Sequence, residues 1–371
     1  MRRLYPAFAA CLLILSGVGI LSAQSNTFSR RDMLTHIGTT IILPLHQTLV
    51  AQAEALDERA AELKAQPSLE TLLAAQAQWR ITMTNWRQAS LFALGRQTLV
   101  LHSAIESPVP PNVAYIETLI ADPSIVLDAA FLQTQGSNVA GLGVVEYLLF
   151  GLDTTPEAQV ALLSGGDGAR RLDYLTAVTG MLRRAAGDLL NYWQPENGDG
   201  YLQAFIEQDD PFNVRESINM LVNALIAGTE LMVHQDIAVP LGLQIGRPSP
   251  NLVRTPYSDY TLDLMRTTLE MVRLVFTGGG DAEADPGLNA FLDASGAARD
   301  GVPLSQIITD EIDVIIADIN RIDAPLRQIV TGDQTPLLAL YQDMRALYLM
   351  MKTDMISQLG LTITFSGSDG D

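Results

Sequence analysis

Cysteine is almost absent from this chain of 371 residues, because Cys11 is the single one. It lies in an apolar run over residues 8–21, which follows a basic start and precedes small residues. This order is typical of a secretory signal peptide, so we expect cleavage of residues 1–23 and a mature chain that begins at Gln24. Retention of the run as a membrane anchor is the alternative. A mature chain without cysteine has no disulfides and no thiolate metal ligands.

Basic residues are also scarce, with 23 Lys and Arg against 42 Asp and Glu and a formal net charge of −19. Phosphate contacts need clustered Lys and Arg, so nucleic acid is not an expected partner. The charge also disfavours anionic membrane surfaces, and no run after the signal is long enough to span a bilayer. An acidic surface is compatible with cation binding, although solubility is the simpler explanation. We therefore expect an exported protein of the periplasm or cell envelope.

Familiar catalytic motifs are missing. The sequence contains neither the H-E-x-x-H of zinc peptidases nor the G-x-S-x-G of serine hydrolases. Its four histidines, His36, His46, His102 and His234, do not have the spacing of a shared metal site. We expect His46 to be a packing or surface residue, and His102 to interact with Glu106 at a helix end. A catalytic function is therefore the less favoured class.

Strand alternation and hairpin signals are missing as well, whereas helical periodicity runs through most of the chain. The pattern predicts a first long helix with a kink or break at Pro44, and a second helix over 68–103. The Gly- and Pro-rich stretch 239–257 predicts a domain connection or a long loop. We expect an all-α fold of two packed helical-bundle domains, residues 24–238 and 239–371.

One acidic residue stands inside a strongly apolar predicted helix. Residues 139–152 read VAGLGVVEYLLFGL, in which Glu146 is the one charged residue. Burial of an unpaired carboxylate is unfavourable, so Glu146 needs a cation, a set of hydrogen-bond donors or a proton. This makes Glu146 the best candidate for a functional acid. A structural carboxylate, paired with an arginine or with backbone donors, is the open alternative.

The same segment resembles the signature of the imelysin family, the M75 peptidase-like proteins of the bacterial envelope. GLGVVEYLLFG at 141–151 matches the pattern G-x-H-x-x-E at Gly141 and Glu146, with Gly143 in place of the histidine. Looser matches follow along the chain at Trp79, Trp86, Phe92 and Gly95, in the stretch 257–278 and in the tail 359–371. The resemblance implies an all-α fold of two bundle-like domains with the motif near the cleft between them. It also implies a link to iron uptake and, for some members, metallopeptidase activity.

Departures from the family pattern bear on metal binding. In a helix, His and Glu three positions apart share a face and can hold one metal ion, and Gly143 removes the histidine. The family often has acidic residues where this chain has Ser90 and Arg254. By the resemblance, three of four ligand positions are lost, which leaves Glu146 as the candidate ligand for iron or zinc. We hypothesise that Arg254 pairs with Glu146, so that a salt bridge replaces the metal site.

These observations predict an exported, imelysin-like binding or accessory protein with a degenerate metal site. It would be associated with the uptake of iron or another metal, and its expected partners are a metal ion or envelope uptake proteins. Glu146 would lie in the cleft between the domains, lined by Gly141, Gly143, Ser90 and Arg254. Two alternatives stay open: an M75-type metallopeptidase that uses other ligands, and a non-catalytic periplasmic interaction protein.

Overall fold

A computed structural model describes most of the chain, namely residues 28–107, 110–196, 200–207, 216–280 and 285–364. Helices dominate these ranges. The strands within them are β1 (Ala298–Arg299) and β2 (Val302–Pro303), one short antiparallel pair. The all-α prediction is confirmed. The predicted signal peptide, with Cys11, lies outside the described residues.

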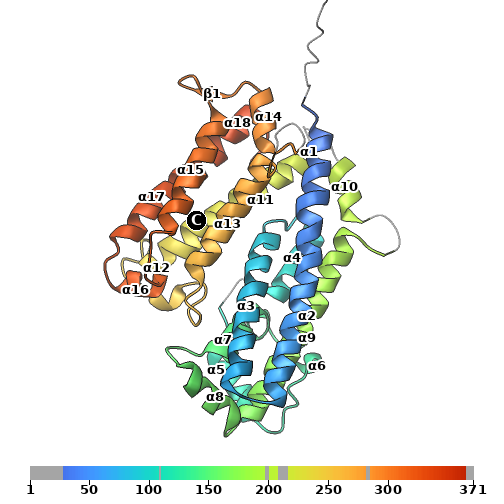
Figure 1. Cartoon of the computed structure of the whole chain (residues 1–371), viewed down its shortest axis with the longest axis vertical. Helices are drawn as coiled ribbons and strands as arrows, with labels where there is room; N and C mark the ends of the chain where they lie inside the picture. The colour runs from blue at the N-terminus through green and yellow to red at the C-terminus, as the bar shows by residue number, and fades with distance from the viewer. Residues whose placement is uncertain (1–27, 108–109, 197–199, 208–215, 281–284, 365–371) are drawn as a thin grey trace, which may run out of the picture.

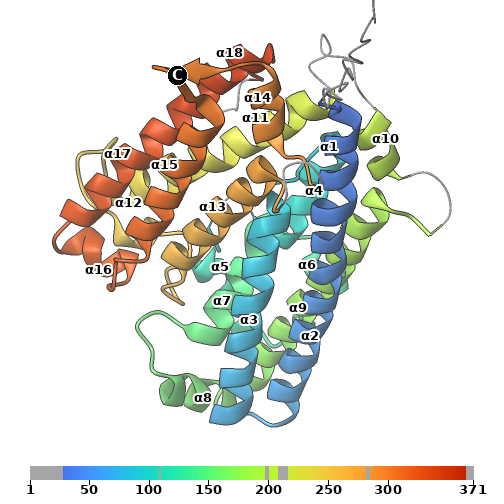
Figure 2. The ribbon, with the colours of Figure 1, turned by 45° about the horizontal axis from the view of Figure 1, so that its top comes forward.

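The helices form two groups that lie side by side (Figure 1, Figure 2). The group coloured blue to green is the first bundle, in which α2 packs along both α3 and α9 at the centre. Its elements are α1 (Arg30–His36), η1 (Ile37–Ile42), α2 (Leu43–Ala65), α3 (Leu69–Ser90), α4 (Arg96–Ile105), α5 (Val113–Ala121), α6 (Ala129–Leu132), η2 (Ser137–Val139), α7 (Leu142–Phe150), α8 (Pro156–Ser164), α9 (Gly168–Trp193) and α10 (Tyr201–Glu207).

The group coloured yellow to red is the second bundle, in which α13 packs on α15 and α17 packs on α11 and α15. Helix α13 also packs on α3 and so joins the two bundles. The helical elements of the second bundle are α11 (Ser217–Leu231), η3 (Met232–Ala238), α12 (Val239–Leu241), η4 (Pro250–Leu252), α13 (Thr261–Thr277), α14 (Leu288–Ala294), α15 (Leu304–Ile319), α16 (Leu326–Thr331), α17 (Thr335–Leu349), η5 (Met350–Met355) and α18 (Ile356–Leu359).

The boundary between the bundles falls earlier by packing than the sequence predicts. Helix α11 and the π-helical turn η3 contact α13 and α17 of the second bundle. Both elements lie before residue 239, where we expected the second domain to begin. Packing therefore assigns the chain from Ser217 onward to the second bundle. That the two bundles are separate domains stays a prediction.

The predicted helix over 68–103 is two helices in the structure. Helix α3 begins after Ser68, which caps it in a reciprocal pair of hydrogen bonds with Thr71 (3.1 and 3.2 Å), and it ends at Ser90. Helix α4 begins after Gly95, where φ is +90° and a Cβ atom would lie 2.5 Å from the Tyr192 hydroxyl. Glycine adopts this backbone conformation without strain, so the chain can turn there. Because the helical periodicity continues through the residues between α3 and α4, the sequence pattern did not predict this turn.

Both bundles contain a π-helical turn just before a proline. The turn η1 precedes Pro44, and the turn η3 precedes Pro240. Proline has no amide hydrogen and crowds the carbonyl four residues earlier, so the helix widens there. The kink or break that we expected at Pro44 is therefore a π-helical turn, after which the helix continues to Ala65. In the second bundle, η3 presents Gln235 and Asp236 to the first bundle, whereas the His234 ring packs edge-on against Tyr348.

Helix α3 supports both sides of the junction. Trp79 is fully buried, and its indole Nε1 donates to the carbonyl of Leu142 at the start of α7 (2.9 Å). The Trp79 ring also meets the ring of Tyr260 edge-on, with centroids 6.3 Å apart. The hydroxyls of Thr84 and Tyr260 are 3.0 Å apart. One helix of the first bundle thus fixes α7 and the segment that leads into α13.

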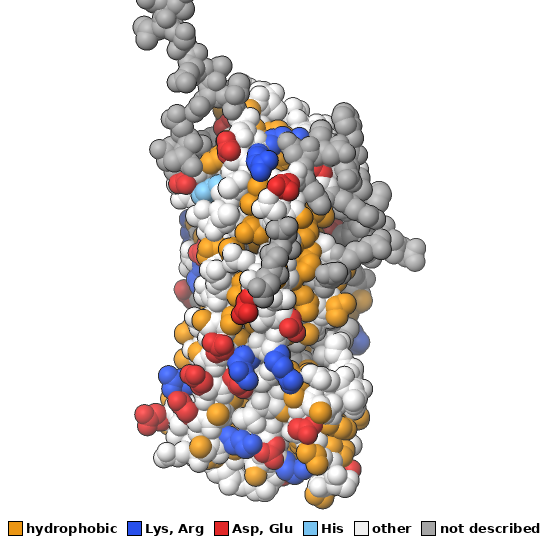
Figure 3. Space-filling view, turned by 90° about the vertical axis from the view of Figure 1, so that its right-hand side faces the viewer, with side chains coloured by type: hydrophobic (Ala, Val, Ile, Leu, Met, Phe, Trp, Pro, Cys, Tyr) orange, Lys and Arg blue, Asp and Glu red, His pale blue; other side chains and the backbone are white. Residues whose placement is uncertain are grey.

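The surface carries both signs of charge. On the face shown in Figure 3, acidic and basic side chains are interspersed over the lower half, with hydrophobic side chains between them. Among the described residues, no helix has the length and apolarity needed to cross a bilayer.

Candidate functional site

Helix α7, which carries the signature-like segment, has a glycine at each end. Gly141 is its N-cap residue with φ of +90°, and a Cβ atom there would lie 2.8 Å from the carbonyl oxygen of Ile105. Gly151 ends the helix with φ of +62°. Between them nearly every side chain is buried. Gly141 is therefore needed for the close approach of α7 to the end of α4.

Glu146 lies on the buried side of α7 and is 1% exposed. Its Oε1 atom accepts three hydrogen bonds from the segment before α13: from the Tyr257 amide (3.1 Å), the Ser258 amide (2.8 Å) and the Ser258 hydroxyl (2.7 Å). The Glu146 carboxyl group, which belongs to the first bundle, thus holds the segment that leads into α13 of the second bundle. The expected burial is confirmed. Of the two interpretations left open by the sequence, the donors match the structural one.

Burial decides the protonation of Glu146. Removal from water raises the pKa of this carboxyl to about 8, although the Ser258 hydroxyl and the two backbone amides favour the charged form. Asp259 raises the pKa further. At neutral pH the group is therefore mostly a neutral acid, which can act as a hydrogen-bond donor and acceptor at once.

The position of the missing histidine is filled by a neighbouring loop. A Cβ atom on Gly143 would lie 3.2 Å from Cγ of Pro111, which packs against this turn of α7. Around Glu146 the polar partners are hydrogen-bond donors rather than metal ligands. No group of three or more His, Cys, Asp or Glu side chains that could hold a metal ion occurs in the described ranges. These residues do not fit a bound iron or zinc ion, and the metal analysis proposed below tests the role of Glu146 as a metal ligand.

Arg254 does not pair with Glu146, so that hypothesis is wrong. Its Nε donates to Oδ1 of Asp236 (2.6 Å), and its Nη1 donates to Oε1 of Glu106 (3.3 Å). Glu106 also accepts a hydrogen bond from Nε1 of Trp86 (2.7 Å). Arg254 follows the π-helical turn that carries Asp236, so the carboxylates within its reach come from η3 and from the end of α4.

A second arginine completes this cluster. Nη2 of Arg87 lies 3.7 Å from Oδ2 of Asp236, and the Arg87 and Asp236 side chains are 4% and 1% exposed. We call Arg87, Glu106, Asp236 and Arg254 the ion cluster. Burial alone would raise the pKa of Glu106, but Arg254 and Arg87 outweigh it and lower that pKa. The Glu106 carboxylate is therefore ionised, in contrast to the neutral Glu146.

Sequence reasoning missed two members of this cluster, Asp236 and Arg87. Asp236 has a weaker form of the signal that singled out Glu146, since apolar residues follow it in MVHQDIAVPL but His234 and Gln235 precede it. Arg87 follows Trp86 in a helix that is otherwise poor in charge, and nothing in the local pattern indicates its burial. Glu106 was assigned to a helix-end interaction with His102, whereas its carboxylate binds Trp86 and Arg254.

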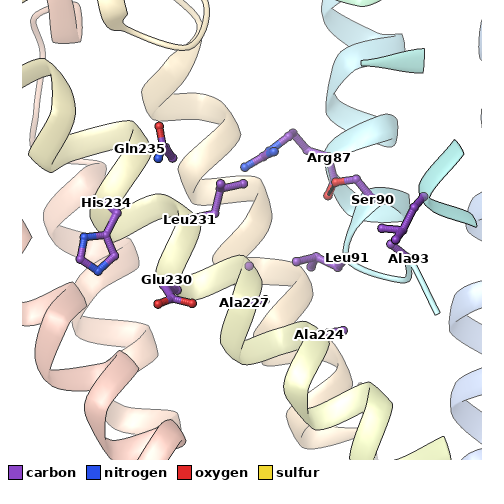
Figure 4. A pocket seen from close by; sticks show the side chains of 12 residues that line it. Arg87, Ser90, Leu91, Ala93, Ala224, Ala227, Glu230, Leu231, His234 and Gln235 are labelled. Atoms are coloured by element: carbon purple, nitrogen blue, oxygen red, sulfur yellow. Dashed lines mark hydrogen bonds between the residues drawn. The ribbon is translucent and has the colours of Figure 1, made fainter. Parts of the chain in front are cut away.

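A pocket of about 480 Å³ opens between the bundles beside the ion cluster (Figure 4). One wall comes from α3, α4 and the turn between them, and the other comes from α11 and η3. The residues that line it are Arg87, Ser90, Leu91, Ala93, Leu99, Ala224, Ala227, Gly228, Glu230, Leu231, His234 and Gln235. Its size is typical of sites for small organic ligands.

The residues predicted to share one cleft are divided between two places. Ser90 lines the pocket, and its hydroxyl donates to the carbonyl of Arg87 (3.0 Å). Arg254 does not line the pocket. It pairs with Asp236, which in turn lies beside the pocket residue Arg87. Gly141, Gly143 and Glu146 belong to the contact of α7 with its neighbours and are not part of the pocket lining.

The buried histidines are packing residues. Nδ1 of His46 donates to the carbonyl of Ile42 (2.8 Å), and its ring lies 5.3 Å from that of Trp193. The His102 ring meets Trp86 edge-on at 4.8 Å. Burial lowers the pKa of each histidine to about 4. Both are therefore neutral at physiological pH, as the expected packing role of His46 requires.

Two helical bundles, joined by a buried glutamic acid and an ion cluster, define an all-α protein with a pocket at the bundle junction. The model of the Imelysin family (Peptidase_M75) matches residues 42–347, and the chain belongs to this family. The resemblance seen in the sequence is confirmed. A search of curated proteins found no match to the chain.

Two solved structures share the fold. A putative iron-regulated protein A precursor from Parabacteroides distasonis superposes with a TM-score of 0.72 at 20% sequence identity, covering 89% of this chain and 94% of its own. An Imelysin-like protein from Psychrobacter arcticum gives a TM-score of 0.64 at 16% identity, covering 90% of this chain and 97% of its own. The likeness extends over both bundles.

Proposed function

We propose that this chain is an exported, non-catalytic binding protein of the imelysin family that serves iron uptake at the cell envelope. Membership of the family and the fold shared with a protein described as iron-regulated support the link to iron. The apolar run at the N-terminus, which follows a basic start, supports export. The ligand or partner occupies the junction between the bundles, where the pocket opens.

The observation that carries a binding rather than a peptidase role is the state of Glu146. A metallopeptidase needs a metal with an open position and a base that can take a proton from water. Here Oε1 of Glu146 already accepts three hydrogen bonds from Tyr257 and Ser258. Pro111 packs where the histidine of the family motif would stand. The residue that aligns with the signature acid therefore holds the bundles together.

Metal analysis of the purified mature chain, residues 24–371, tests the absence of a metal site. We expect no bound metal and no thermal stabilisation by ferrous, ferric or zinc ions, because ligand binding to the folded state would raise the melting temperature. Peptidase assays with and without a chelator complete the test. Chelator-sensitive cleavage would establish the metallopeptidase alternative instead.

The link to iron needs a test in the cell that does not depend on metal binding by the chain itself. Deletion of the coding sequence should slow growth when iron is limiting and leave growth unchanged when iron is abundant. Fractionation of the same cells should place the protein in the envelope. Equal growth of both strains at every iron level would contradict the proposed role.

A further inference from the structure

Arg87 is a buried guanidinium that is poorly paired. Its side chain is 4% exposed, and it makes no side-chain hydrogen bond within the described part of the protein. Its nearest anion is Asp236 at 3.7 Å, and the Nε atom of Arg87 is buried without a partner. A guanidinium has five N–H donors, and unpaired buried donors are unfavourable. A buried guanidinium of this kind indicates that a hydrogen-bond acceptor outside the described side chains, such as a ligand, completes its bonding.

Arg254 explains why Asp236 does not serve as the hydrogen-bond acceptor of Arg87. Arg254 holds Oδ1 of Asp236 at 2.6 Å and also takes Glu106, so it draws both carboxylates of the ion cluster toward itself. Among the described residues, Oδ2 of Asp236 has no hydrogen-bond partner. Burial and the positive charge of Arg254 lower the pKa of Arg87, which indicates a charge that is weakly compensated.

The pocket supplies the space in which an acceptor can reach Arg87. In Figure 4 the Arg87 side chain extends from α3 toward Gln235 and Leu231 on the facing helix. Ser90 lies one turn further along α3 on the same wall and adds a hydroxyl. The polar end of the pocket is therefore built around one guanidinium.

The remainder of the pocket is mostly apolar. Leu91, Leu99 and Leu231 line it together with three alanines. Gly228 lets α11 approach α3 closely, since a Cβ atom there would lie 2.3 Å from Cδ2 of Leu91. Leu99 is 63% exposed, so an apolar side chain stands open to solvent at the mouth. A hydrocarbon body fits this part of the pocket better than a second charged group does.

We propose that this pocket binds a small organic monocarboxylate, with the carboxylate against the guanidinium of Arg87 and an apolar body against Leu91, Leu99 and Leu231. The proposal rests on the binding role proposed above and names the class of ligand. A guanidinium takes a carboxylate through two parallel hydrogen bonds, which a lysine cannot reproduce. A dianion such as a phosphate monoester is disfavoured, because the carboxylate of Asp236 adjoins the guanidinium of Arg87.

Binding of three matched probes to the mature wild-type chain tests the proposal. The probes are 3-phenylpropionate, 3-phenylpropanol and 3-phenylpropylamine, which share one body and differ in the head group. Calorimetric titration should give a Kd for the carboxylate at least about tenfold lower than for the alcohol or the amine, as expected for a charge-assisted pair. A fourth probe, 2-phenylethyl phosphate, should bind more weakly than the carboxylate.

Two variants locate the site. Arg87→Lys keeps the positive charge but removes the two parallel N–H donors of the guanidinium. It should weaken carboxylate binding by at least about tenfold. Ala227→Phe fills the pocket from an exposed position of α11, so it blocks binding without disturbing the ion cluster. Ala61→Phe, at another exposed alanine on α2, is the matched control and should bind as wild type does.

Several results would overturn the proposal: no binding of the carboxylate, equal binding of the alcohol, tighter binding of the phosphate, or unchanged binding by Ala227→Phe. None of these assays contains iron or zinc. Failure here therefore leaves the link to iron uptake untouched, and failure of the growth test leaves the carboxylate site untouched.

Discussion

Replacement of Glu146 by glutamine should stabilise the protein at alkaline pH and have little effect near pH 5. Glutamine has the shape of the neutral acid, and its amide oxygen can accept the hydrogen bonds from Tyr257 and Ser258 that Oε1 accepts now. Unlike the acid, it cannot ionise. The variant therefore isolates the energetic consequence of one buried titration.

The magnitude follows from the pKa of Glu146, which burial raises from 4.5 to about 8. In the unfolded chain the group ionises above its ordinary pKa, whereas in the folded protein it stays protonated up to the higher value. The unfolded state thus binds fewer protons between these limits, and stability falls as pH rises. Each pH unit corresponds to about 1.4 kcal/mol, so the loss approaches about 3 kcal/mol at neutral pH and up to about 5 kcal/mol above pH 8.

Thermal or urea denaturation of wild type and Glu146→Gln at matched pH values measures this difference. The gap in the free energy of unfolding should widen in favour of the variant from about pH 5 to about pH 8 and then level off. Glu58→Gln, an exposed carboxylate on α2, is the control and should follow the wild-type profile. A variant less stable than wild type by the same amount at every pH would refute the reasoning, because the three donors would then hold an ionised carboxylate.

Three other substitutions test the packing of the site. Gly143→His should lower the free energy of unfolding by about 1–3 kcal/mol, because a side chain there meets Pro111 at 3.2 Å; calorimetric titration should also show no new zinc affinity. Glu106→Gln should lower the free energy of unfolding by about 3 kcal/mol, since the substitution leaves the buried ion cluster with an unbalanced positive charge. A urea titration that shows no change would contradict the pairing of Glu106 with Arg254. Gly141→Ala should cost about 1–3 kcal/mol because φ is +90°, whereas Gly187→Ala in the open middle of α9 should be neutral or slightly stabilising in the same melt.

The local sequence pattern was sufficient to predict the all-α fold class and the burial of Glu146 at the site. Helical periodicity and the lack of strand alternation predict the all-α class, because each depends on residues only a few positions apart. The burial of Glu146 follows in the same way from the apolar residues on both sides of it. The family was recognisable because its motif is a short continuous segment around that residue.

The partners of these residues could not be predicted in this way. Glu146 binds the amides of Tyr257 and Ser258, which are 111 and 112 residues away. Arg254 pairs with Glu106 across 148 residues of sequence, although the sequence pattern favoured Glu146 as its partner. Sequence spacing carries no information about which of two distant acids a guanidinium will reach.

The sequence by itself determined that this chain is helical, that it belongs to the imelysin family and that its signature acid is buried, since each property resides in neighbouring residues. Tertiary structure alone decided that Pro111 fills the place of the missing histidine, that Arg254 joins the ion cluster, and that Arg87 is left facing a pocket. The physical reason is that ion pairs and close contacts depend on how the two bundles meet. That arrangement is set by the packing of α3 against α7 and α13.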